Sequence, residues 1–123
     1  MFKFAHTNFQ VSDLERSLKF YKEALNLTEK SRTDCGDFIL VYLGDKYNSQ
    51  HRLELKYFKD RKEPYNLGDN KTHLAFTTKN FSTAHELHEK MNCIVTENKA
   101  MRIYFIADPD GNSIEILPED DDF

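Results

Sequence analysis

Long apolar runs are missing from this sequence of 123 residues, and cysteine is scarce. No stretch approaches the roughly 18 apolar residues that indicate a membrane-spanning helix, and the first residues lack the apolar segment of a signal peptide. The two cysteines, Cys35 and Cys93, do not have C-x-x-C spacing, and neither is predicted to be a nucleophile. We therefore expect a protein of the reducing cytoplasm that has no membrane partner.

A concentrated positive charge is also absent. The 17 Lys and Arg residues are scattered, and 21 Asp and Glu residues give a formal net charge of -4. Proteins that bind nucleic acids or anionic membranes usually carry a basic patch or stripe. No P-loop, G-x-G-x-x-G or G-x-S-x-G motif occurs either. These absences favour a small-molecule substrate over a nucleic-acid or membrane partner.

Material for a hydrophobic core is present. Hydrophobic residues make up 39% of the chain and include ten Phe and six Tyr. A chain of this length fits one compact domain, although a cofactor or a partner would add to the stability of so small a core.

The first half of the chain predicts the order strand, helix, strand, strand, strand. The expected elements are a strand at 2–11, a helix from 12 to 25, and strands at 27–33, 38–43 and 52–57. Ser12 to Glu15 match the S-x-x-E capping box that begins a helix, and Asn26 is expected to end it. The predicted apolar face of this helix consists of Leu14, Leu18, Tyr21 and Leu25.

The second half repeats this order after a charged segment, 59–71, that favours turns and is predicted to be a linker. The expected elements are a strand at 72–78, a helix at 81–91 with Phe81, Ala84, Leu87 and Met91 on one side, and strands near 94, at 103–106 and at 113–117. The sequence thus predicts an α+β fold of two βαβββ modules in a single domain. Module one spans about 1–58 and module two about 72–117, and the acidic tail 118–123 is expected to be solubilising.

Four residues occupy matching places in the two halves. His6 and His73 lie on the first strand of each module, and Glu54 and Glu115 lie on the last, each between two aliphatic residues. Because side chains alternate along a strand, each of these residues points away from its apolar neighbours. Two imidazoles and two carboxylates on such faces would suit a divalent transition metal.

Simpler explanations exist for each residue taken alone. A single Glu between aliphatics, such as Glu54, is more often part of a solvated strand face, and a single His is more often hydrogen-bonded than a ligand. The repetition is harder to attribute to chance, and the residue pattern alone leaves both explanations open. His85 and His88, three residues apart on the second predicted helix, have no uniquely placed carboxylate partner and are expected to be solvated.

Several short segments of the chain form a recognisable set. The most specific are the helix segment S-L-K-F-Y at 17–21 and the ending D-P-D-G-N-S-I-E-I at 108–116, and the set also includes H-T at 6–7, L-N-L at 25–27 and L-E-L at 53–55. Together they resemble glyoxalase I, the lactoylglutathione lyase family of the vicinal oxygen chelate, or glyoxalase/bleomycin resistance, superfamily. The resemblance covers nearly the whole chain.

The resemblance implies a homodimer with paired sheets and a metal cavity shared between the chains. His6, Glu54, His73 and Glu115 would be the metal ligands, with nickel expected first and cobalt or zinc as alternatives. The implied reaction isomerises the hemithioacetal of methylglyoxal and a thiol through an enediolate whose charge the metal offsets as a Lewis acid. Glu115 would be the general base, and Glu54 a ligand with a secondary acid/base role.

Three features depart from the family pattern at the thiol end of the site. Gln10 stands where an Arg grips the glutathione carboxylate, Phe58 stands where the family tends to have Asn, and the loop at 96–103 is short. The pocket is therefore expected to accept a different thiol or another oxygen-chelating substrate in place of glutathione. The alternatives are an epimerase or dioxygenase of the superfamily, or a non-catalytic binding protein of the bleomycin-resistance kind.

Overall fold

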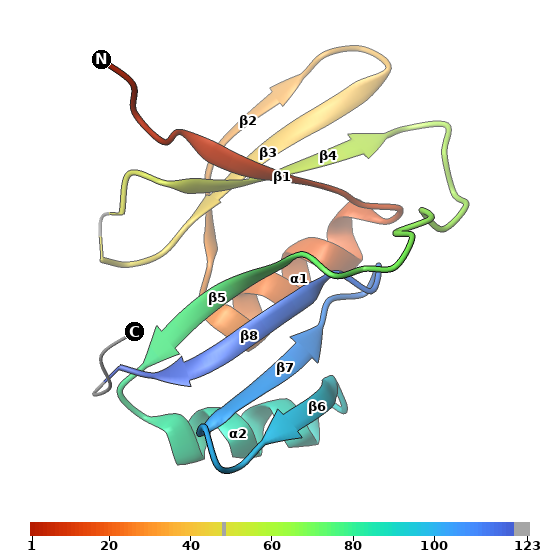
Figure 1. The fold of residues 1–123 in the computed structure, drawn as a ribbon. Coiled ribbons are helices and arrows are strands. Elements are labelled where there is room, and N and C mark those ends of the chain that lie inside the picture. Colours follow the sequence, from red (N-terminus) through yellow and green to blue (C-terminus); the bar gives the residue numbers. More distant parts are fainter. Residues whose placement is uncertain (48, 120–123) are drawn as a thin grey trace. The chain divides into compact units, whose positions relative to one another are not determined.

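The computed structural model describes residues 1–47 and 49–119. The chain divides into two compact units, of which the first spans Met1–Asn66 and the second begins at Leu67. The boundary falls inside the segment 59–71. Each unit contains a four-stranded sheet and a helix (Figure 1).

The first unit has its strands in the order β1-β4-β3-β2. Its elements are β1 (His6–Gln10), α1 (Leu14–Leu25), β2 (Thr28–Asp34), β3 (Phe38–Gly44) and β4 (Arg52–Phe58). β1 is parallel to β4, while β3 is antiparallel to both β4 and β2. The parallel pair places the first and last strands of the unit side by side.

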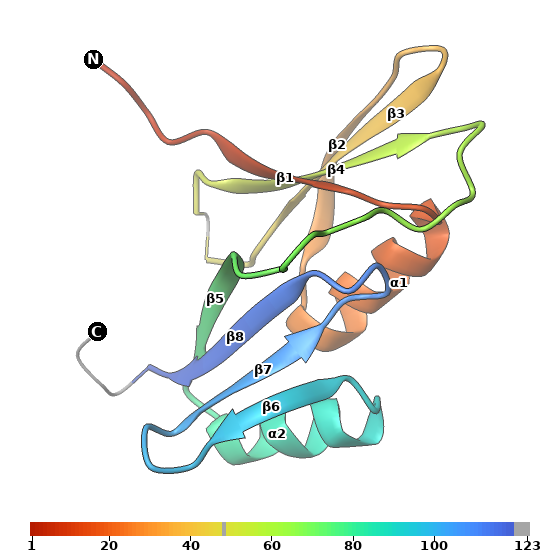
Figure 2. The same cartoon turned by 45° about the vertical axis from the view of Figure 1, so that its right-hand side comes forward.

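The second unit repeats this topology with the order β5-β8-β7-β6, and β8 lies between β5 and β7 (Figure 2). Its elements are β5 (His73–Thr78), α2 (Phe81–Lys90), β6 (Ile94–Asn98), β7 (Ile103–Ala107) and β8 (Ser113–Pro118). The predicted α+β fold of two βαβββ modules is confirmed. The main difference is that the first strand begins at His6 and not at residue 2.

Strand alternation separates an apolar face from a polar face in the first sheet. Leu53 and Leu55 are buried beside Val41 and Leu43 of the neighbouring strand, and together with α1 residues they form the core. Glu54, between the two leucines, points to the opposite face. Burial of the leucines therefore decides which way the carboxylate faces.

The start of α1 differs from the predicted capping box. Asp13, rather than Ser12, is the N-cap, and its carboxylate accepts a hydrogen bond from the Arg16 backbone N–H at 3.1 Å. The Ser12 hydroxyl instead accepts from the Arg16 guanidinium at 3.0 Å. Asn26 ends the helix in the left-handed conformation, with φ 56°, as predicted.

The buried face of α1 also differs from the predicted one. Leu14 and Tyr21 are buried as expected, whereas Leu18 and Leu25 are only half-buried. The remaining buried positions of the helix are Ser17, Phe20 and Ala24.

Replacing Asp13 by alanine should lower the free energy of unfolding by about 1 kcal/mol, because the N-cap acceptor is lost. Ser12→Ala should change it by less than about 0.5 kcal/mol, as is usual for a surface position. Urea denaturation of both variants would measure the two effects. A larger loss for Ser12→Ala would show that Ser12 is the cap.

The second helix has a different inward face from the predicted one. Leu87 is 39% exposed, while His88 is only 1% exposed and bonds the Tyr104 hydroxyl through Nδ1 at 2.8 Å. The expectation that His88 is solvated was therefore wrong, because Tyr104 of β7 supplies a buried partner. His85 is half-buried, and its Nε2 lies 2.5 Å from Glu97, a carboxylate partner that was not predicted.

No helix in the described part of the chain is both long enough and apolar enough to cross a membrane. The location in the cytoplasm stays a prediction. Of the predicted tail 118–123, Pro118 belongs to β8 and Glu119 is exposed, while 120–123 lie outside the described residues.

Candidate metal centre

Strand register brings His6 and Glu54 together in the first unit. In the parallel pair of β1 and β4, His6 is opposite Arg52 and Asn8 is opposite Glu54. His6 and Glu54 therefore share one face of the sheet, two positions apart. The His6 Nε2 lies 3.5 Å from Glu54 Oε1, and the His6 ring meets the ring of Tyr42 edge to face at 5.7 Å.

Glu54 is held by two side chains from the neighbouring strands. The Asn8 amide donates to Oε1 at 2.8 Å, and the Tyr42 hydroxyl donates a short hydrogen bond to Oε2. Gln10 in turn donates to the Asn8 carbonyl oxygen at 3.1 Å. The carboxylate is thus buried, with its side chain 11% exposed, and both of its oxygens accept a hydrogen bond.

These contacts favour the charged form of Glu54. Burial raises the pKa of its carboxyl, but the hydrogen bonds from Tyr42 and Asn8, together with nearby His6 and Lys56, outweigh burial, so the pKa is lower than usual. The same hydrogen bond, followed by burial, raises the pKa of the Tyr42 hydroxyl. Glu54 is therefore an anion at neutral pH, as a metal ligand must be.

The second unit repeats the pair in the same register. His73 is opposite Ser113, Ala75 is opposite Glu115, and the His73 Nε2 lies 3.7 Å from Glu115 Oε1. The His73 ring meets the ring of Phe105 edge to face at 5.1 Å. Each unit therefore presents an imidazole and a carboxylate on the face away from its aliphatic neighbours.

The geometry of each pair fits a divalent ion. Two ligands that each lie about 2.1 Å from one ion can be at most about 4.2 Å apart, and the separations of 3.5 and 3.7 Å satisfy this limit. Imidazole nitrogen and carboxylate oxygen suit nickel, cobalt and zinc. No group of three or more His, Cys, Asp and Glu that could hold a metal occurs among residues 1–47 and 49–119. That one ion has all four residues as ligands stays a prediction.

Sequence reasoning missed Asn8 and Tyr42. Asn8 lies two residues after His6, and this spacing alone could have placed its side chain on the same face. Tyr42 lies inside the apolar run of β3, and only the register of β3 against β4 shows that it is opposite Glu54.

The residues that depart from the family pattern have local contacts. Gln10 bonds Asn8, as described above. The rings of Phe58 and Phe38 have centroids 5.5 Å apart, and the Lys56 ammonium lies 4.8 Å from the Phe58 ring centroid. The predicted loop at 96–103 is shorter in the structure, because 96–98 belong to β6 and β7 begins at Ile103; the connection is 99–102, with Arg102 in the left-handed conformation at φ 55°.

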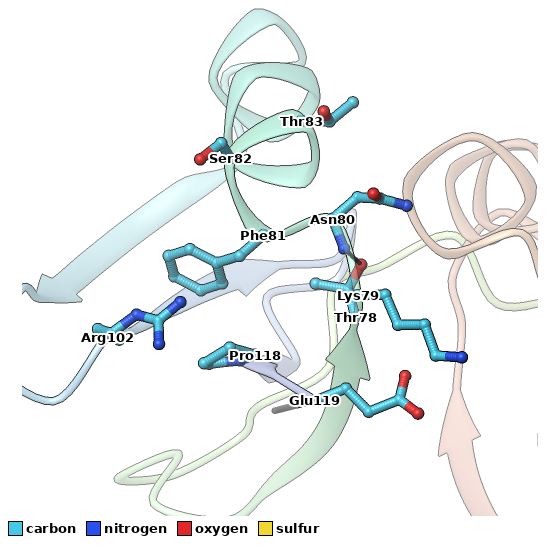
Figure 3. Close-up of a pocket in the computed structure, with 9 residues that line it drawn as sticks. All are labelled: Thr78, Lys79, Asn80, Phe81, Ser82, Thr83, Arg102, Pro118 and Glu119. Atoms are coloured by element: carbon cyan, nitrogen blue, oxygen red, sulfur yellow. Dashed lines mark hydrogen bonds between the residues drawn. The ribbon is translucent and has the colours of Figure 1, made fainter. Parts of the chain in front are cut away.

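A separate hollow lies at the start of α2 (Figure 3). It is lined by residues 78–83, Arg102, Pro118 and Glu119. The Arg102 guanidinium lies over the Phe81 ring, 5.8 Å from its centroid. None of the four predicted ligands lines it, so it is not part of the candidate metal centre.

Comparison with known proteins agrees with this geometry. Residues 3–116 match the model of the Glyoxalase/Bleomycin resistance protein/Dioxygenase superfamily. The chain is 31% identical to the probable lactoylglutathione lyase of Synechocystis over 91% of its length and 92% of the relative's. It is 32% identical to the lactoylglutathione lyase of Neisseria meningitidis serogroup A over 91% of its length and 87% of the relative's.

Among solved structures, the chain is similar to the trypanothione-dependent glyoxalase I of Leishmania major. The TM-score is 0.85 at 30% identity, and the match covers 97% of this chain and 88% of the other. The resemblance inferred from the sequence motifs is therefore confirmed.

Proposed function

The chain belongs to the Glyoxalase/Bleomycin resistance protein/Dioxygenase superfamily and is a lyase of the glyoxalase I type. We propose that this protein isomerises the hemithioacetal of methylglyoxal and a thiol to a 2-hydroxyacyl thioester, and that it requires one divalent metal. The observation that carries the proposal is the repeated His–Glu pair, which has the same register and nearly the same separation in both units.

The metal would be held by His6, Glu54, His73 and Glu115, two residues from each unit. One unit supplies too few ligands for a protein metal site of usual coordination number, which supports a site assembled from two pairs. We propose a homodimer in which such a site is shared between chains. Nickel is the metal proposed first, with cobalt and zinc as alternatives.

The metal, when bound, stabilises the negative charge that develops on two neighbouring substrate oxygens, typically by several kcal/mol. The protein's own contribution is proton transfer. Glu115 takes the proton from the hydroxyl-bearing carbon and returns it to the adjacent carbon, while the hydroxyl proton passes to the oxygen of that adjacent carbon, so that the first carbon becomes the thioester carbonyl. The two imidazoles would hold the metal through Nε2, the nitrogen that faces the glutamate in each unit.

The thiol cosubstrate is proposed to differ from glutathione. Gln10, at the position of the carboxylate-gripping Arg of the family, carries no charge and donates to Asn8, so it cannot form the ion pair that an Arg makes with a carboxylate. The similar Leishmania major enzyme is trypanothione-dependent. Trypanothione is therefore one thiol to be compared with glutathione.

The test is turnover of methylglyoxal by the purified protein after separate reconstitution with nickel, cobalt and zinc. Glutathione, trypanothione and other low-molecular-weight thiols would be supplied in parallel, and thioester formation would be followed by its absorbance. We expect about one metal per site and turnover with at least one thiol, fastest with nickel. Absence of turnover with every metal and thiol, in protein that holds metal, would contradict the proposal.

A further inference from the structure

The two units differ at the strand positions that face the two glutamates. Tyr42 is opposite Glu54 in the pairing of β3 with β4, and Phe105 is opposite Glu115 in the equivalent pairing of β7 with β8. On the other side, Asn8 is opposite Glu54, and Ala75 is opposite Glu115. The duplicated framework thus has hydrogen-bond donors around one carboxylate and apolar side chains around the other.

This difference has a direct consequence for the carboxylates. Glu54 accepts one hydrogen bond on each oxygen, from Asn8 at 2.8 Å and from Tyr42. Each carboxylate oxygen has two lone pairs, so one remains on each oxygen for a metal or for His6. Neither Phe105 nor Ala75 has a side-chain donor that could hold Glu115 in the same way.

Gln10 extends the asymmetry along β1. Its amide donates to Asn8 Oδ1 at 3.1 Å, which orients the Asn8 amide nitrogen toward Glu54. The equivalent position on β5, two residues after Ala75, is Thr77. The side chains of Gln10, Asn8 and Glu54 therefore form a connected row of hydrogen bonds that ends at the Glu54 carboxylate.

We propose that Tyr42 and Asn8 are positioning residues that hold Glu54 as a fixed metal ligand and so leave proton transfer to Glu115. This inference rests on the proposed function, which already gives proton transfer to Glu115, and it adds the two residues that hold the other carboxylate in place. Hydrogen-bonded partners of metal ligands orient the ligand and raise metal affinity. A base that serves two adjacent carbons must instead change its position between them, and Phe105 and Ala75, the residues opposite Glu115, offer no side-chain donor that would hold it.

Uptake of a proton by Glu54 would also disrupt its contacts. A protonated carboxyl oxygen loses acceptor capacity, so the hydrogen bonds from Asn8 and Tyr42 would be weakened or broken. No such cost arises at Glu115 from Phe105 or Ala75. The same argument predicts that adding a donor opposite Glu115 would impair it as a base.

The experiment removes the donors from one unit and adds one to the other. Tyr42→Phe and Asn8→Ala give the first unit the residues of the second, and Phe105→Tyr does the reverse. The dissociation constant for Ni²⁺ would be measured on the full chain by competition with a chromogenic chelator, and kcat and KM by thioester formation. Tyr57→Phe removes a hydroxyl from the same strand as Glu54, at a position that contacts Lys62, and is the matched control.

We expect Tyr42→Phe and Asn8→Ala each to raise the dissociation constant for Ni²⁺ about 10-fold or more, whereas Tyr57→Phe changes it less than about twofold. Phe105→Tyr should lower kcat at least about tenfold without weakening Ni²⁺ binding. Thermal unfolding of each variant verifies that it is folded, and Asn8→Ala tests the proposal independently if Tyr42→Phe does not fold.

The inference and the proposed function fail in different ways. Wild-type protein that binds none of nickel, cobalt and zinc, or that turns over no hemithioacetal with any of these metals, would overturn both. Wild-type protein that binds nickel and is active, combined with unchanged Ni²⁺ affinity in Tyr42→Phe and Asn8→Ala, would overturn only the assignment of Tyr42 and Asn8.

Discussion

Replacing Glu115 by glutamine should lower kcat about 10²- to 10⁴-fold, the range that a positioned general base contributes. The amide keeps the shape and one oxygen of the carboxylate but cannot accept a proton at neutral pH. The side chain is 17% exposed and lies next to His73, so the substitution should not unfold the protein. Steady-state turnover of the nickel-loaded variant measures the effect.

Glu86→Gln is a matched control in the same unit, because Glu86 is exposed on α2. It should retain the kcat of the wild-type enzyme. Turnover of Glu115→Gln close to that of Glu86→Gln would rule out Glu115 as the base. Metal content must be determined alongside, because loss of nickel from Glu115→Gln would lower activity for a different reason.

Replacing His73 by alanine should lower the affinity for Ni²⁺ by more than about 100-fold, since even residues that only support a ligand contribute about 10- to 100-fold. The His73 Nε2 lies 3.7 Å from Glu115 Oε1, and His73 is the imidazole member of this His–Glu pair. His6→Ala should have an effect of the same order, because the first unit carries the same pair. Calorimetric titration with Ni²⁺ would measure both.

The second unit contains its own control for this prediction. His85 and Glu97 form another His–Glu pair, with Nε2 and Oε1 2.5 Å apart, but it involves α2 and has no equivalent among the predicted ligands. His85→Ala should leave Ni²⁺ affinity unchanged. Equal losses in His85→Ala and His73→Ala would show that imidazole content, and not the duplicated pair, determines binding.

Local patterns were sufficient to predict most of the fold. Turn-favouring residues and strand alternation marked eight strands and two helices in the observed order, because these signals depend on neighbours along the chain. Errors arose where a partner from another element decides the outcome. His88 is buried because Tyr104 of β7 accepts or donates a hydrogen bond there, and no pattern within α2 indicates this.

The pairing of His with Glu in each unit was also foreseeable in part. The duplicated sequence places a His on the first strand of each module and a Glu on the last. Strand alternation shows that the glutamates face away from their aliphatic neighbours. It does not show that β1 pairs with β4, or β5 with β8. That parallel pairing, with its register, sets the separations of 3.5 and 3.7 Å.

The sequence by itself determined the order of elements, the duplication and the four residue types that suit a metal, because these follow from periodicity and composition. Only the tertiary structure showed which side chains surround each carboxylate, by placing Tyr42 and Asn8 against Glu54 and Phe105 and Ala75 against Glu115. The physical reason is that a hydrogen bond between strands depends on which residues lie opposite each other. That register is a property of the assembled sheet, and no strand specifies it alone.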